Sequence, residues 1–283
     1  MEEASGVAYD PWWRRFLARG PAVSLGTTLT IYAVNIFYAH QAPSFLSNAT
    51  QDRILVSSAI GTFLYFFFSA ALKDPGYVED GYQPPREAVR HLPMCRVCLH
   101  LKPPRASHCR RCGKCVRRMD HHCPWINNCL GHNNEHVFFV FVLSSANVSF
   151  LCTFLISRIL YHKSVFALSA IPGTFSLTSW PFWATFFTLD YAALSVGLIL
   201  SSVTCFLTSQ LFTVQTWQVL RNRTSIETIL LESLSKAAEE RKTPTICNPY
   251  DIGMWGNLGR LALPGWQSYL LATLVRLGMN ILV

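Results

Sequence analysis

Residues 54–72 read ILVSSAIGTFLYFFFSAAL, an apolar run without a charged side chain. The hydrocarbon core of a bilayer is about 30 Å thick, and a helix needs roughly 20 apolar residues to cross it. Three further runs of comparable length lie at residues 22–40, 136–160 and 184–211. The sequence therefore predicts an all-α polytopic membrane protein with four transmembrane helices.

The composition of the chain agrees with a membrane protein. Of its 283 residues 51% are apolar and only 14% are charged, which is too apolar for an ordinary soluble protein. Four buried helices in a large soluble core are the alternative, but these runs are apolar around their whole circumference. The first run is too long and too late for a cleaved signal peptide, so we expect it to stay as an anchor.

Basic residues predict the orientation of the spans, because Lys and Arg next to a span are retained on the cytosolic side. Arg14, Arg15 and Arg19 precede the first run, and eleven Lys or Arg lie within residues 73–118. Basic residues also follow the fourth run, among them Arg221, Arg223, Arg241 and Lys242. The other two connections carry little beyond Arg53 and Lys163. We therefore expect both termini and the central loop in the cytosol.

These predictions divide the chain into four parts. Residues 1–72 hold the N-terminus and helices 1–2, residues 73–134 a cytosolic cysteine-rich domain, and residues 135–211 helices 3–4. Residues 212–283 form a cytosolic C-terminal region. Within it, apolar residues at helical spacing predict an amphipathic helix (Ile226, Ile229, Leu230, Leu234 and Ala237) before a turn at Asn248-Pro249-Tyr250-Asp251.

Much of the net charge of +8 lies in the central loop, where eleven basic residues oppose five acidic ones. Attraction to the anionic headgroups of the lipid bilayer explains most of these side chains. The other interpretation is contact with the phosphates of a nucleotide-bearing substrate, for which Arg110, Arg111, Lys114 and Arg117 are candidates. A nucleic-acid partner is disfavoured because this basic run is interleaved with cysteines and tethered to a membrane.

Seven of the ten cysteines fall between Cys95 and Cys129, with His108, His121 and His122 interleaved. The segment from Gly81 to Asn134 shows no sustained helical or strand periodicity, so it needs a cross-link such as a bound metal ion or a disulfide to fold. In a reducing compartment, repeated C-x2-C pairs beside histidine indicate zinc rather than disulfides or free thiols. Two tetrahedral ions need eight ligands, and neighbours such as His108 and Cys109 should serve different ions.

This count leaves one cysteine and one histidine, and Asp120-His121-His122-Cys123 supplies both within four residues. An imidazole that accepts the thiol proton would activate Cys123 as a nucleophile, with His121 as the base and Asp120 orienting it. Spacing alone leaves open that Cys123 or His121 is one more zinc ligand. It also leaves open a membrane-tethered zinc module, such as a RING-like ubiquitin ligase or a scaffold. A transporter or channel is disfavoured because the spans show no visible polar pathway.

The segment from Cys95-x2-Cys98 through Asp120-His121-His122-Cys123-Pro124-Trp125 to Asn127-Asn128-Cys129 resembles the cysteine-rich domain of DHHC protein S-acyltransferases. The resemblance extends to Asp74-Pro75-Gly76, to Thr224-Ser225-Ile226-Glu227 and to the motif that begins at Asn248. The family's Thr-Thr-x-Glu element has Ser225 as its second residue here, which keeps the hydroxyl.

This resemblance implies a palmitoyltransferase with two structural zinc ions, palmitoyl-CoA as donor and membrane-associated proteins as cysteine-bearing substrates. Its ligand sets are Cys95, Cys98, His108 and Cys115 for one ion, and Cys109, Cys112, His122 and Cys129 for the other. It implies Cys123 as the nucleophile, His121 as the base, Asp120 as its orienter, and Ser225 as a hydrogen-bond partner of Asp120. Golgi or endoplasmic reticulum is the location the family suggests, with the plasma membrane also open. The sequence reveals neither the protein substrates, the acyl length, a homo-oligomer, glycosylation at Asn48 nor modification of Cys247.

Overall fold

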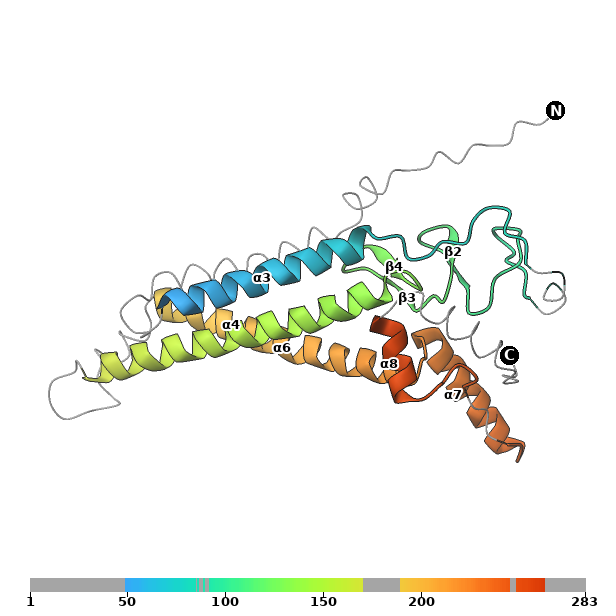
Figure 1. Cartoon of the computed structure of the whole chain (residues 1–283). Helices are drawn as coiled ribbons and strands as arrows, with labels where there is room; N and C mark the ends of the chain where they lie inside the picture. Colours follow the sequence, from blue (N-terminus) through green and yellow to red (C-terminus); the bar gives the residue numbers. More distant parts are fainter. Residues whose placement is uncertain are drawn as a thin grey trace. The chain divides into compact units, whose positions relative to one another are not determined.

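The computed structural model describes residues 49–84, 86, 89, 92–169, 189–244 and 248–262. Within these ranges three helices are long and apolar enough to cross a membrane: α3 (Ala49–Leu72), α4 (Glu135–Ser169) and α6 (Leu189–Leu220) (Figure 1). They correspond to the second, third and fourth predicted spans. The first predicted span, the sequon at Asn48, Cys247 and the residues after 262 lie outside the described residues.

The helices extend beyond two of the predicted bounds. The apolar part of α4 continues to Phe166 instead of residue 160, and α6 continues to Leu220 instead of residue 211. The end of α6 was missed because its last turns contain polar residues, which the hydropathy pattern reads as a loop. Gln215, Gln218 and Val219 are nevertheless buried there, so packing keeps this segment helical.

The described residues form two compact units. One joins residues 49–67 to residues 140–169 and 189–212, and the other joins residues 68–139 to 213–262. In the first unit, Phe63 of α3 packs against Phe141 of α4, with ring centroids 5.7 Å apart. Large apolar side chains such as Tyr65, Phe150 and Phe206 are exposed, as expected for surfaces that meet lipid.

The second unit begins where α3 ends. The helix stops at Leu72, just before Lys73-Asp74-Pro75-Gly76, and the Asp74 carboxylate accepts the Gly76 N–H at 2.6 Å. Asn128 caps the helix end by donating to the carbonyls of Ala70 and Lys73. Gly131 allows close packing here, since a Cβ atom would lie 2.5 Å from the Pro75 carbonyl oxygen.

The cysteine-rich region contains two short antiparallel hairpins that the sequence did not indicate. Strand β1 (Ser107–Cys109) pairs with β2 (Lys114–Val116), and β3 (His121–Cys123) pairs with β4 (Asn128–Leu130). Strands of three residues are too short for an alternating pattern to be detected. In the part of the chain that the structure describes, the expected all-α fold is therefore corrected to a mostly helical one with four short strands.

Helix α7 (Ser225–Glu240) occupies the segment with apolar residues at helical spacing, and it begins with a capping box between Thr224 and Glu227. A further helix, α8 (Met254–Ala262), follows the Asn248 turn and was not predicted. Both helices belong to the same unit as the two hairpins.

Candidate active site and metal centres

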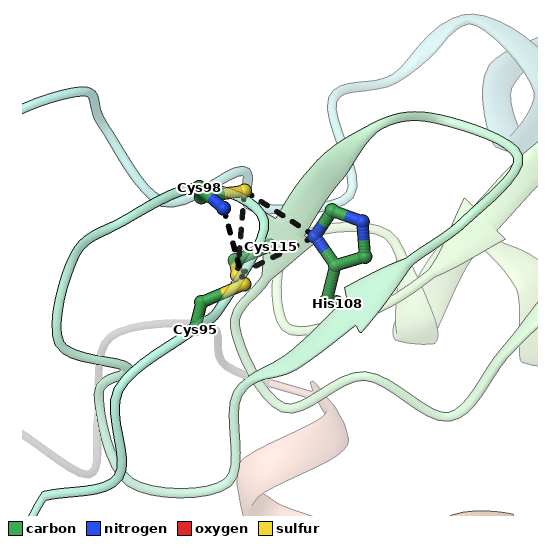
Figure 2. Close-up of side chains that lie close together, drawn as sticks. All are labelled: Cys95, Cys98, His108 and Cys115. Carbon is green, nitrogen blue, oxygen red and sulfur yellow. Dashed lines mark hydrogen bonds between the residues drawn. The ribbon is translucent and has the colours of Figure 1, made fainter.

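The first cluster of metal-binding side chains consists of Cys95, Cys98, His108 and Cys115 (Figure 2). Their ligand atoms all lie within 4.8 Å of one another. His108 Nδ1 lies 3.3 Å from Cys98 Sγ and 3.9 Å from Cys115 Sγ, and the two sulfurs are 3.9 Å apart. A tetrahedral zinc with ordinary bond lengths would give edges of about 3.6–3.8 Å. The donors are thus spaced to share one ion.

Hairpin β1–β2 builds this first cluster. His108 and Cys115 are directly opposite in its register, so both reach the same face. The backbone N–H of Cys98 points to Cys95 Sγ at 3.4 Å, the tight turn expected of a C-x2-C pair.

The second cluster consists of Cys109, Cys112, His122 and Cys129. Three sulfurs lie 3.4–3.7 Å from His122 Nδ1, and Cys112 Sγ lies 3.4 Å from Cys129 Sγ. His122 and Cys129 are opposite in hairpin β3–β4, while Cys109 comes from β1. Each hairpin therefore contributes to this cluster, and the two clusters alternate along the chain.

Crowding of the donors shifts their proton affinities. Hydrogen bonds from the backbone at Cys98 lower the pKa of Cys95 to about 7, although burial opposes this shift. Burial and the sulfurs of Cys95 and Cys98 raise the pKa of Cys115 to about 12. Several acids crowded at one site cannot all ionise unless a cation replaces their protons. Both clusters thus have the chemistry of sites that could hold a metal ion.

Cys123 belongs to neither cluster. It lies at the end of β3 with its side chain buried, and it shares a side-chain hydrogen bond with His121. His121 Nδ1 lies 2.7 Å from Asp120 Oδ2, so the imidazole is hydrogen-bonded to a carboxylate as well as to the thiol. Burial alone would lower the pKa of His121, but the hydrogen bonds to Asp120 and Cys123 outweigh it and raise this pKa to about 9.

Helix α7 supplies the other partners of Asp120. The backbone N–H of Ser225 donates to Asp120 Oδ1, and the Ser225 hydroxyl donates to Oδ2 at 3.1 Å. Ser225 is the first residue of α7, so the carboxylate sits at the positive end of a helix dipole. These contacts fix the direction in which Asp120 presents its oxygens to His121.

An ion pair attaches the first turn of α7 to the cysteine-rich region. Arg105 Nε donates to Glu227 Oε1 at 2.5 Å and Nη2 donates to Oε2 at 2.6 Å, a bidentate geometry. Arg105 also donates to the side chain and backbone oxygens of Asn222, in the turn before α7. The side chain of Arg105 is mostly buried, at 11% exposed.

A second buried ion network lies close to this first one. Glu135 accepts from Arg260 of α8 through two bonds of 2.7 and 3.0 Å, and it also accepts from Arg118. Arg118 donates in turn to Asn222 at 3.1 Å. We expected most basic residues of the central loop to meet bilayer headgroups. Arg105 and Arg118 instead bind side chains and backbone of the protein itself. No sequence pattern could reveal this, because the partners lie 17 to 125 positions apart.

The basic residues proposed to contact phosphates differ in exposure and in their partners, and Asn248 lies elsewhere. Arg110 and Arg111 are exposed beside the second cluster, whereas Lys114 lies over the ring of Tyr77 and Arg117 lies 3.8 Å from Glu79. Asn248 donates to the carbonyls of Arg221 and Asn222, so it caps the end of α6 rather than touching Cys123.

Comparisons with known proteins give the same family for most of the chain. A family model described as DHHC palmitoyltransferase matches residues 90–232, half of the chain. "Probable protein S-acyltransferase 16" of Arabidopsis thaliana is 29% identical over an alignment that covers 93% of both chains. "Palmitoyltransferase ZDHHC14" of Danio rerio is 31% identical over 64% of this chain, and the human protein of that name is 41% identical over 31%. The chain spans 42% and 19% of the lengths of these two relatives.

Proposed function

The chain belongs to the DHHC palmitoyltransferase family, and on this premise we propose that it is a protein S-palmitoyltransferase that carries the acyl group on Cys123. One observation supports this role most directly. Cys123 is buried next to a histidine that is itself fixed by Asp120, and it stands outside both four-residue clusters. A thiol with its own oriented base has the arrangement that nucleophilic catalysis requires.

Two zinc ions suit the two clusters. Each cluster offers three thiols and one imidazole at tetrahedral spacing, which is a typical donor set for structural zinc. With all four positions of each ion taken by protein, no coordination site remains for a substrate or a reactive water. The ions would supply folding free energy, on the order of 10 kcal/mol per site in small zinc peptides, to a region whose core is small.

In the first step His121 takes the proton of Cys123, and the sulfur attacks the carbonyl carbon of the acyl-CoA thioester. The new carbon–sulfur bond forms as the bond to the CoA sulfur breaks. The CoA thiolate then takes the proton from His121 and leaves as a thiol.

In the second step a cysteine of the target protein gives its proton to His121 and attacks the acylated Cys123. The acyl group moves to the target, and Cys123 recovers its proton from His121. Both steps exchange one thioester for another, so their driving force is small and catalysis rests on positioning and on proton transfer.

The environment of His121 suits both steps. Hydrogen bonds to Asp120 and Cys123 favour the protonated ring, as the raised pKa of His121 records. The positive ring stabilises the negative charge that develops on the neighbouring sulfur, and Asp120 stabilises the positive ring.

The whole chain would act as a four-span enzyme with both termini and residues 73–134 in the cytosol, in Golgi or endoplasmic reticulum membranes or the plasma membrane. The exposed guanidinium groups of Arg110 and Arg111 are the best candidates to meet CoA phosphates, with Lys114 and Arg117 as further candidates. The targets would be membrane-associated proteins, because the acyl chain has to remain in lipid while the thiol reaches Cys123.

A labelling experiment tests this proposal. Purified protein in detergent is incubated with radiolabelled palmitoyl-CoA, and the adduct is treated with neutral hydroxylamine, which cleaves thioesters. Cys123→Ser should not label, whereas Cys205→Ser, which removes a thiol of α6 outside the clusters, should label like the parent. Equal labelling of Cys123→Ser and the parent would overturn the role of Cys123.

A further inference from the structure

A glutamine that no sequence pattern singled out extends the hydrogen-bonded chain behind Cys123. Gln218 Nε2 donates to Ser225 Oγ at 3.0 Å, and Ser225 Oγ donates to Asp120 Oδ2 at 3.1 Å. Asp120 Oδ2 also lies 2.7 Å from His121 Nδ1. Four side chains from α6, α7 and the cysteine-rich region are thus joined in series.

The direction of these bonds is fixed by chemistry. A hydroxyl has one proton to donate and two positions at which it accepts. The amide of Gln218 occupies an accepting position of Ser225, so the hydroxyl proton stays available for Asp120. The Asp120 carboxylate can only accept, so the Ser225 hydroxyl donates to Asp120 and accepts from the Gln218 amide.

Serine makes this external support necessary. The second hydroxyl residue of the family's motif is threonine, whose branched Cβ restricts rotation about χ1, whereas serine turns more freely. Ser225 also stands in the first turn of α7, where a serine hydroxyl can bond to nearby backbone groups instead. A donor that holds the oxygen in place removes these alternatives.

The side chain of Gln218 is buried at the end of α6. It is 7% exposed and lies between Trp217 and Val219 in the sequence. A buried amide is costly unless it is hydrogen-bonded, so its partner matters. It lines, together with Asp120, Arg118 and Thr224, a small cavity of about 10 Å³, enough for about one water.

We propose that Gln218 is a positioning residue for the acyl-transfer reaction: it holds the Ser225 hydroxyl toward Asp120, and through Asp120 it sets the orientation of His121. This inference rests on the proposed function of Cys123. If this is so, substitutions of Gln218 and Ser225 have non-additive effects on the rate of Cys123 acylation. A threonine at position 225 then makes Gln218 dispensable for that rate.

The test measures single-turnover acylation of Cys123 by palmitoyl-CoA in four variants. Gln218→Met keeps the length of the side chain and removes the donor. It should lower the rate constant about 3- to 10-fold, the range for loss of one hydrogen bond, without changing its dependence on the palmitoyl-CoA concentration. Ser225→Thr in the Gln218→Met background should restore the rate to within about twofold of the parent.

Two further variants sharpen the result. Gln218→Glu has the same shape but accepts the Ser225 proton, so it should be slower than Gln218→Met. Gln210→Met is the control, because it makes the same change about two turns earlier in α6 at an exposed position. It should acylate at the parent rate, and all variants should retain two zinc ions.

Parent-like acylation by Gln218→Met would overturn the inference. So would a slow Gln218→Met that Ser225→Thr does not restore, because that result assigns Gln218 to the packing of the helix end. A parent that does not acylate would refute the proposed function instead. The coupling is then read from the rate of alkylation of Cys123 by iodoacetamide at one fixed pH, which needs no acyl-CoA. That rate should change in Gln218→Met and return to the parent value in the double variant.

Discussion

The ion pair between Arg105 and Glu227 should determine both the stability of the cysteine-rich region and the position of α7. Glu227→Gln removes the charge but keeps an oxygen and the length of the side chain, and glutamine can still serve in the capping box. The parent pair has two bonds of 2.5 and 2.6 Å between side chains that are 11% and 19% exposed. A charge-assisted bond contributes about 1.5–3 kcal/mol.

Because glutamine retains one acceptor, we expect the free energy of unfolding to fall by about 3 kcal/mol rather than by the full value of both bonds. For a chain of this size each kcal/mol lowers the Tm by about 2 °C, so the Tm should fall by about 6 °C. Burial raises the pKa of Glu227, but the hydrogen bond and charge of Arg105 outweigh it, and this pKa lies below the usual glutamate range. The contribution is therefore complete above about pH 4.3, the pKa of an unfolded glutamate, and would be lost only under acid conditions. The Tm difference should be constant between about pH 6 and 8.

The assay is thermal unfolding in detergent of the parent, Glu227→Gln, Arg105→Met and the double variant, with single-turnover acylation measured in parallel. Both single variants should also acylate more slowly, because α7 carries Ser225 and with it Asp120. Glu232→Gln is the control, since it makes the same change at an exposed position of α7. If the Tm changes of the two single variants add up to that of the double variant within about 1 °C, the two side chains are not coupled and the reasoning is refuted.

Three further predictions concern the site and its support. His121→Ala should lower the rate of Cys123 acylation about 100-fold or more, the usual contribution of a general base, while two zinc ions remain bound; a rate within twofold of the parent would exclude His121 as the base. Removal of metal with a strong chelator should unfold the segment from Cys95 to Cys129 and expose it to proteases, whereas the spans stay protected; a segment that resists proteolysis without metal would contradict structural zinc. Arg260→Met should lower the Tm by about 6 °C or more, because it removes one partner of the buried Glu135 at a cost of about 3–5 kcal/mol, and Arg260→Lys should not restore it, because an ammonium cannot make both bonds. Full rescue by lysine would show that charge alone matters there.

Sequence alone was sufficient for the features whose signal is local. Long apolar runs marked α3, α4 and α6, and C-x2-C spacing beside histidine indicated zinc, since a metal ion selects particular residue types at short separations. The division of the ligands into two sets came from the family resemblance. The resemblance also paired Ser225 with Asp120, and the structure places their side chains 3.1 Å apart.

Features that depend on distant partners could not be predicted. Arg105 and Arg118 read as surface charges among eleven basic residues, yet their partners Glu227 and Asn222 are supplied by the C-terminal region more than 100 positions away. Strands of three residues carry no detectable period, and Gln218 is one of several polar residues in the last turns of α6. Its partner Ser225 becomes visible only when α6 and α7 are placed around the turn at Asn222.

The mass of the intact protein under native conditions, before and after palmitoyl-CoA, tests the central claim most directly. The parent should carry two zinc ions and gain one palmitoyl group, whereas Cys123→Ser should keep both zinc ions and gain none. A Cys123→Ser protein that loses one zinc ion would show that Cys123 is a metal ligand, and one that still gains the palmitoyl group would place the nucleophile elsewhere. Either result would contradict a zinc-built domain that holds Cys123 free to react.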